Sequence, residues 1–304
     1  MPARTVVPIS EGPLGVLDLL DGSFAVLRQR ARVIVGIVAG LVLPVALLQA
    51  WASRDDLGGS TFSDLLNDPA ASTGNTSPFA AYDLLFFLTK GLGLAVTAAG
   101  GVAVSRVVAG WLDGQDLSAL DALRFTARRL PALAGSFVIV HLLEGVGFLL
   151  LGVPGLAAIV LCSLTSPVLA IEGLGPVAAV RRSAELVRRR PGPVIGLTLL
   201  LFAVQYGVSQ AVGTLPGAVA LFVGPDRAWP LLAASNTITS LILVPVTGAA
   251  MCLAYLDLRF RTEGLDLDRR IQRCFGGGEA TYRAGGEATY RAGGEATYRA
   301  DTAA

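Results

Sequence analysis

The residues best able to carry chemistry are six polar side chains set within long apolar stretches. They are Lys90, His141, Glu144, Gln205, Gln210 and Asn236. Such groups are costly in hydrocarbon and usually face the interior of a helix bundle or a water-filled cavity. Two interpretations stay open: a path for a substrate or proton, or hydrogen bonds between helices that fix their packing. The second use is common in membrane bundles.

Three of these side chains are expected at similar depth on consecutive apolar stretches. Counting 1.5 Å per residue, Lys90 lies about 16 Å from the start of its stretch. His141 and Glu144 lie about 15 and 20 Å from the start of theirs on the same count. We therefore expect Lys90 to pair with Glu144, with His141 as a second polar neighbour, because a paired charge costs less in hydrocarbon than a lone one.

The chain lacks the residue patterns of the common enzyme and metal sites. One histidine excludes a centre with several histidine ligands. The cysteines, Cys162, Cys252 and Cys274, form no C-x-x-C pair. Neither a G-x-x-x-x-G-K-[ST] phosphate loop nor a G-x-S-x-G elbow occurs. We expect a protein that is not an enzyme and that holds no metal and no cofactor.

The elements that must position these residues are membrane-spanning helices. Of the 304 residues, 53% are hydrophobic and 15% are charged, and the mean hydropathy is +0.62. Soluble domains carry about 25% charged residues. Apolar stretches near or above the roughly 18–20 residues of a bilayer-spanning helix cover 33–52, 79–110, 131–151, 154–171, 193–223 and 230–258. We predict an all-α integral membrane protein with six transmembrane helices in a domain over 1–273.

The remaining segment, 274–304, has a different composition. It contains GGEATYRA three times, at 277–284, 285–292 and 293–300. These repeats hold no long apolar side chain with which to offset the entropy of ordering, so we predict a disordered cytoplasmic tail.

Arginine placement predicts the orientation of the spans. Arginines precede the first stretch and fill the segments before the third and fifth, whereas 53–78 carries one arginine against four aspartates. Positive charge marks cytoplasmic segments, so both termini are expected in the cytosol. The single lysine among 24 basic residues is typical of a GC-rich bacterial gene. The expected location is the cytoplasmic (inner) membrane of a bacterium, with several passes.

Each of these basic segments has the pattern of an amphipathic helix. In 172–192, EGLGPVAAVRRSAELVRRRPG, four apolar residues recur at helical spacing: Val177, Val180, Ala184 and Val187. Leu186 falls off this stripe. The spacing recurs at Leu17, Leu20, Phe24 and Leu27, and again at Leu120, Leu123, Ala127 and Leu130. We predict three hairpins of spans, each preceded by a cytoplasmic interfacial helix.

The arginines of these segments are candidate contacts for anionic lipid headgroups. They are Arg28, Arg30, Arg124, Arg128, Arg181, Arg182, Arg188 and Arg189. Anchoring at the membrane surface is one role for them, and docking of a membrane protein partner or coupling of transport is the other. Nucleic acid is not expected as a partner, because the net charge is +1 and no aromatic residues alternate with the arginines.

Three segments resemble a known family: GPLGVLDLLDGSFAVLRQR, GLGPVAAVRRSAELVRRRPGPVIGLTLL and AYLDLRFRTEGLDL. Together they are similar to the membrane domain of glycerophosphoryl diester phosphodiesterases and its stand-alone, largely actinobacterial relatives, over roughly residues 10–270. The resemblance implies six helices, cytoplasmic elbow helices and a largely unassigned role. The hydrolase of those enzymes is a separate soluble barrel, which this sequence lacks.

Three functions follow as hypotheses. We expect a structural or accessory component of the membrane. A transporter or permease-like subunit, with a polar path through the bundle, is the alternative. A membrane-embedded lipid-processing enzyme is the third.

Overall fold

The computed structural model describes residues 15–52 and 84–263, and these ranges form α-helices without any strand. Six of the helical segments are long and apolar enough to cross a membrane. This agrees with the prediction of an all-α chain with six candidate spans. The predictions for the outer loop and for the repeats of the tail lie outside the described residues.

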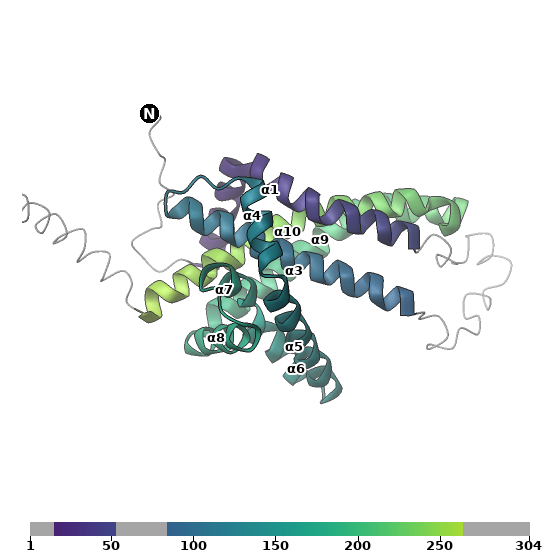
Figure 1. The fold of residues 1–304 in the computed structure, drawn as a ribbon. Coiled ribbons are helices and arrows are strands. Elements are labelled where there is room, and N and C mark those ends of the chain that lie inside the picture. The colour runs from purple at the N-terminus through teal and green to yellow at the C-terminus, as the bar shows by residue number, and fades with distance from the viewer. Residues whose placement is uncertain (1–14, 53–83, 264–304) are drawn as a thin grey trace, which may run out of the picture. The chain divides into compact units, whose positions relative to one another are not determined.

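The described chain contains helices of very different lengths (Figure 1). Their bounds are α1 Val16–Ala52, α3 Leu84–Leu112, α4 Ala119–Arg128, α5 Leu130–Leu149, α6 Val153–Cys162, α7 Thr165–Ile171, α8 Pro176–Arg189, α9 Pro191–Val223 and α10 Pro225–Glu263. The chain divides into two compact units, Met1–Leu256 and Asp257–Ala304. All packing described below lies in the first unit.

Local sequence explains several helix boundaries. Arg30 has non-helical angles, φ −119° and ψ 21°, and it separates the amphipathic start of α1 from its apolar remainder. Ser118 caps α4 in a capping box with Asp121, whose pKa is lowered because its carboxylate accepts hydrogen bonds from the Ser118 hydroxyl and backbone N–H. Pro176 and Pro191 begin α8 and α9, where the missing N–H of proline costs nothing.

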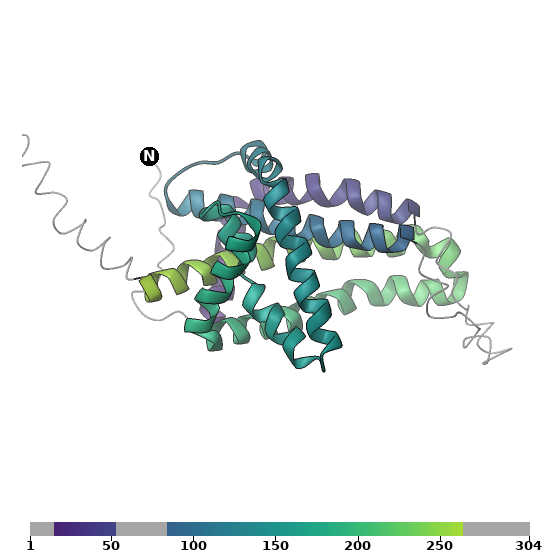
Figure 2. The same cartoon turned by 60° about the horizontal axis from the view of Figure 1, so that its bottom comes forward.

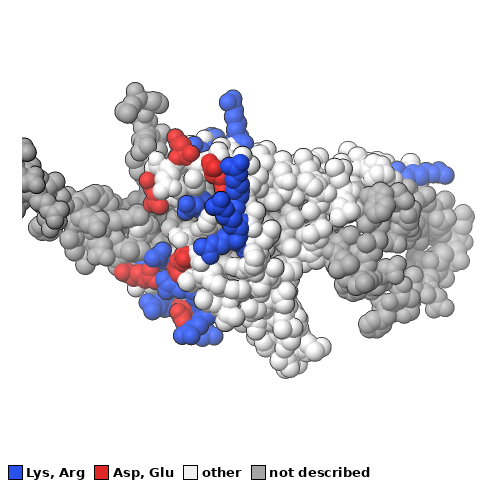
Figure 3. Space-filling model, in the orientation of Figure 1, with Lys and Arg blue, Asp and Glu red and all other residues white. Residues whose placement is uncertain are grey.

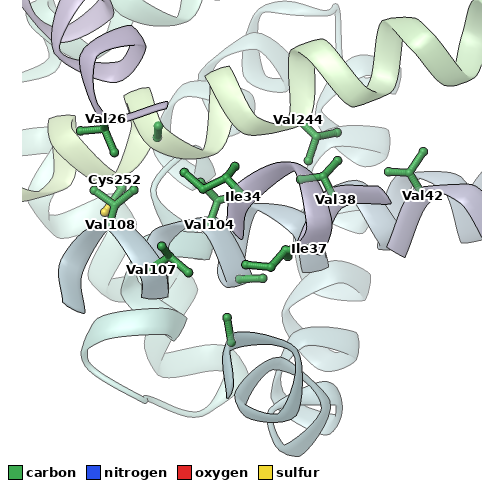
Figure 4. Close-up of a cluster of buried hydrophobic side chains, with 13 residues drawn as sticks. Val26, Ile34, Ile37, Val38, Val42, Val104, Val107, Val108, Val244 and Cys252 are labelled. Atoms are coloured by element: carbon green, nitrogen blue, oxygen red, sulfur yellow. The ribbon is translucent and has the colours of Figure 1, made fainter. Parts of the chain in front are cut away.

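Helices α1, α3 and α10 run side by side and share a core (Figures 1 and 2). Its buried side chains are mostly valine and isoleucine, with alanine and a cysteine (Figure 4). Examples are Ile34 and Val38 of α1, Val104 and Val108 of α3, and Val244 of α10. β-Branched side chains have few rotamers, so a core of this kind is rigid.

Glycines let α3 and α10 approach closely. A Cβ added to Gly100 would lie 2.6 Å from Cγ1 of Val244, and one added to Gly248 would lie 3.1 Å from Cβ of Val104. Small residues at such crossings are the usual means of packing membrane helices. At Gly91, by contrast, an added Cβ would meet no described atom within 4 Å.

The predicted span 154–171 agrees with a candidate span over Val153–Ile171, within which the structure has two helices, α6 and α7. Ser163 and Leu164 form a turn between α6 and α7, in which Ser163 keeps helical angles and Leu164, with φ −92° and ψ 8°, departs from them. Pro167 explains the break, since it has no N–H to give the Ser163 carbonyl and its ring clashes with that group in a continuous helix. The Ser163 hydroxyl donates to Val160 O at 2.8 Å, and the Thr165 hydroxyl donates to Cys162 O at 2.7 Å.

A side chain from α8 satisfies the backbone at this break. The fully buried Ser183 hydroxyl donates to Leu161 O at 2.7 Å and accepts from the Leu164 N–H at 3.2 Å. Backbone groups within apolar surroundings need partners inside the protein. Helix α8 is therefore bonded to the interrupted segment as well as packed against it.

We predict that Gly100→Ala lowers the free energy of unfolding by about 1–3 kcal/mol, because the new methyl group meets the stiff Val244 side chain. The matched control is Gly91→Ala on the same helix, which should be neutral or stabilising by up to about 1 kcal/mol. Unfolding of the purified protein in mild detergent measures both. Equal effects of the two substitutions would contradict the proposed tight crossing of α3 and α10.

Candidate functional site

Charged side chains gather over α4, α8 and the start of α1, while the surface beyond them is largely uncharged (Figure 3). Among the arginines expected to meet headgroups, six are exposed: Arg28, Arg124, Arg128, Arg181, Arg188 and Arg189. The other two, Arg30 and Arg182, are partly buried and form ion pairs within the protein. The arginines of this surface thus fall into an outer set, which is exposed, and an inner set, which is partly buried.

Arg182 belongs to a triad with Glu172 and Tyr255. Its Nε lies 3.0 and 3.1 Å from the two carboxylate oxygens of Glu172, and the Tyr255 hydroxyl donates to the same carboxylate at 2.7 Å. The Arg182 and Glu172 side chains are only 22% and 16% exposed, and Tyr255 is fully buried. The triad joins α8 and α10 to the residue that follows α7.

Two further ion pairs lie at this surface. Arg30, at the kink of α1, pairs with Asp116 in the segment before α4. Arg181 pairs with Glu185 one turn along α8 at 2.8 Å, and its hydrogen bond lowers the Glu185 pKa. The Arg181 and Glu185 side chains are 79% and 45% exposed, so solvent weakens their attraction.

A second inner cluster consists of Arg106, Phe125 and Arg129. The guanidinium carbon of Arg106 lies 5.1 Å from the centre of the Phe125 ring, and that of Arg129 lies 5.8 Å from it. Arg129 also donates from Nη1 to the carbonyl of Gly173. The candidate residues predicted from the sequence do not include this cluster. An arginine inside the apolar stretch 79–110 was the available signal for it.

The apolar face of α8 differs from the predicted stripe. Val180 and Val187 are buried as part of the stripe, but Val177 is 68% exposed. Leu186, which lies off the stripe, is fully buried together with Ser183. This face packs against α5, α6 and α7. The residues buried by α8, Ala179, Val180, Ser183, Leu186 and Val187, form a single face that is rotated about the helix axis from the predicted stripe. The prediction is wrong for Val177 and Leu186 because Ser183, a polar residue, lies at the centre of the buried face.

The corresponding segments of α1 and α4 keep apolar residues on the outside. Leu17 and Phe24 of α1 are exposed, as is Leu120 of α4 and Leu130 at the start of α5. Their opposite faces are buried, at Leu19 and Ser23 in α1 and at Ala122 and Thr126 in α4. These exposed residues belong to the stripes that the sequence assigns to the membrane surface.

His141 and Glu144 lie near each other on α5 and are half-buried. The imidazole Nδ1 lies 2.9 Å from Phe137 O, and the ring stacks on the Phe137 ring with centroids 4.0 Å apart. Lys90 is in α3, which contacts α5, but its side chain is outside the described residues. The pairing of Lys90 with Glu144 therefore stays a prediction.

The three amide side chains lie elsewhere. Gln205 and Gln210 are exposed on α9, and Asn236 is exposed on α10. Within the described ranges, none of these three side chains makes a hydrogen bond to protein. The structure does not bring them together with His141 and Glu144.

Metal coordination has no ready ligand set in the described ranges. There, no group of three or more His, Cys, Asp and Glu residues is placed to hold an ion. The inner arginines are suited to binding. Arg182 holds three elements together through the triad, and Arg106 and Arg129 present guanidinium groups beside an aromatic ring.

We predict that Glu172→Gln lowers the free energy of unfolding by about 1–3 kcal/mol, because it leaves the partly buried Arg182 without its counter-charge. Glu185→Gln is the matched control, since it removes the carboxylate of an exposed pair on the same helix. It should cost about 0–1 kcal/mol. Chemical or thermal unfolding in detergent separates the two, and equal losses would contradict a structural role for the triad.

Comparison with known proteins adds no relative: no protein-family model, no curated protein and no solved structure matches the chain.

Proposed function

We propose that the protein is an integral component of a bacterial cytoplasmic membrane with a structural or accessory role, exerted through association with another membrane protein. In this proposal both termini face the cytosol. The chain forms three hairpins of spans, preceded by the start of α1, by α4 and by α8 as cytoplasmic elbow helices. The arginines on these helices and the six apolar segments support this arrangement.

The accessory role is inferred from the exposed amide side chains of α9 and α10. Gln205 lies 14 residues beyond the start of α9, which is about 21 Å along the helix and well inside a hydrocarbon core about 30 Å thick. Tyr206 beside it is 70% exposed. Polar groups facing acyl chains at this depth are costly, whereas a neighbouring helix can hydrogen-bond to them. A partner helix against α9 would remove that cost.

The likeness to the phosphodiesterase membrane domain is part of the same proposal. It supports a membrane role, because the three similar segments belong to the membrane domain of those enzymes and not to their soluble hydrolase barrel. Anionic lipids at the cytoplasmic face are the proposed small-molecule partners of the outer arginines.

A transporter subunit is the second candidate. The interruption between α6 and α7 favours it, since broken helices line substrate sites in many transporters. His141 and Glu144 lie on α5, which packs against α6. The accessory proposal is preferred because the amide side chains of Gln205, Gln210 and Asn236 face outward. They do not extend a polar path from His141 and Glu144.

Site-specific photocrosslinking in living cells tests the accessory role. With a benzophenone amino acid at Gln205 or Gln210, we expect a discrete crosslinked protein band that survives purification in mild detergent. The control position is Leu142, which is exposed on α5 and apolar, and should yield lipid adducts alone. Mass spectrometry of the band and of co-purified lipids identifies both classes of partner. Equal, diffuse labelling at all three positions would contradict the accessory proposal.

Cysteine labelling tests the proposed topology. In a background without the native cysteines, single cysteines at Ser60 and Ser72 should react with an impermeant thiol reagent in intact cells. Cysteines at Gln115 and Arg188 should react only after lysis. Both cytoplasmic positions are exposed, unlike Ser183, whose burial would block the reagent on either side. Labelling of Arg188→Cys in intact cells would overturn the proposed orientation.

A further inference from the structure

Arg106 and Arg129 are partly buried cations for which the described residues supply no counter-charge. In the described part of the chain, no carboxylate lies within ion-pairing distance of either side chain. Acids of the same surface are engaged by other groups: Glu172 binds Arg182 and Tyr255, Asp116 binds Arg30, and Asp121 binds Ser118. A cation taken partly out of water needs compensation that these acids do not give.

The Phe125 ring orients both guanidinium groups but does not neutralise them. Each guanidinium carbon lies within 6 Å of the ring centre, which is the range of a cation–π contact. Such a contact is worth roughly 0.5–2 kcal/mol and leaves the positive charge in place. Both positive charges therefore lie beside the same ring, where α3, α4 and the start of α5 meet.

The backbone around Arg129 is shaped for its side chain. Gly173 has φ +65°, and a Cβ there would lie within van der Waals overlap of Arg129 Nη2, so glycine leaves the room that the guanidinium occupies. The Gly173 carbonyl takes one of the five N–H donors of Arg129. No described side chain takes a donor of Arg106. Most donors of both residues are therefore available to an external acceptor.

Two helix starts add positive potential near this corner. Arg129 is the cap residue of α5, and no side chain caps α5 or α8. The start of α8 lies against the second turn of α5, because a Cβ added to Gly135 would lie 2.7 Å from Pro176 Cγ. Uncapped N–H groups and the helix dipole favour an anion, although the two arginines are the primary evidence for one.

We propose that Arg106 and Arg129 bind the phosphate group of an anionic phospholipid in the cytoplasmic leaflet. Guanidinium groups match the geometry of phosphate oxygens, and two of them suit one phosphate. A lipid is favoured over a soluble phosphate because apolar residues adjoin the site: Leu130 follows Arg129 directly and is exposed, as is Leu120 of α4. These residues can contact the glycerol and acyl portions. The assignment of the phosphate to a lipid rests on the proposed membrane orientation, whereas the assignment of an anion site to Arg106 and Arg129 does not.

Lipid-dependent stabilisation of the purified protein in mild detergent tests this site. We expect phosphatidylglycerol to raise the melting temperature of the unmodified protein and phosphatidylcholine to do so far less. Arg106→Gln and Arg129→Gln should each weaken the apparent affinity for phosphatidylglycerol at least about tenfold, through the loss of charge-assisted hydrogen bonds. The control is Arg188→Gln, which removes an exposed arginine of the same surface and should retain the response.

Further arms separate the possible failures. If Arg106→Gln does not fold, Arg106→Lys keeps the charge without the planar fork, and it should bind the lipid more weakly than the unmodified protein does. An equal loss in Arg188→Gln would show non-specific attraction and overturn the site. Inorganic phosphate that stabilises as well as the lipid, and competes with it, would overturn the lipid assignment. The assay needs neither a protein partner nor a defined topology, so its failure is distinct from failure of the accessory proposal.

Discussion

Backbone groups that leave a helix within an apolar region must find partners inside the protein, and this constraint organises the arginine-rich surface. Pro167 forces the break between α6 and α7, and Ser183 of α8 supplies a donor and an acceptor there. Once α8 is held at the break, Arg182 is placed beside Glu172. Because Glu172 also accepts from Tyr255, the position of α8 is tied to α10.

The arginines of this surface have two roles, which depend on how the helices pack against the rest of the protein. Those on the buried side of the short helices form bonds within the protein, as Arg182 and Arg30 do. Those on the outside, such as Arg181 and Arg188, remain exposed. A sequence pattern treats all of them as one basic surface, but burial decides which charges are available to lipid or to a partner. Arg106 and Arg129 differ from both sets, because they are partly buried and pair with no acid among residues 15–52 and 84–263.

Much of the fold follows from apolar length and helix-start residues. The six stretches, the separate amphipathic segments and the prolines at the starts of α8 and α9 are visible in the sequence because they depend on neighbouring residues. The break in 154–171 is less visible, since all its residues suit an apolar helix except Pro167. The partners of Ser183 and Arg182 lie 10 to 22 residues away, and Tyr255 lies 83 residues from Glu172. Pairings of this kind depend on tertiary packing, which periodicity does not encode.

The core that α1 and α3 share with α10 has a consequence for synthesis. Val244 and Cys252 complete a cluster begun by Ile34 and Val104, yet they belong to the last helix of the described chain. Until the ribosome has delivered α10, the part of α3 around Gly100 lacks the Val244 side chain that packs against it. A chain that stopped before α10 would leave the side chains of α1 and α3 without the cover that Val244 and Cys252 supply.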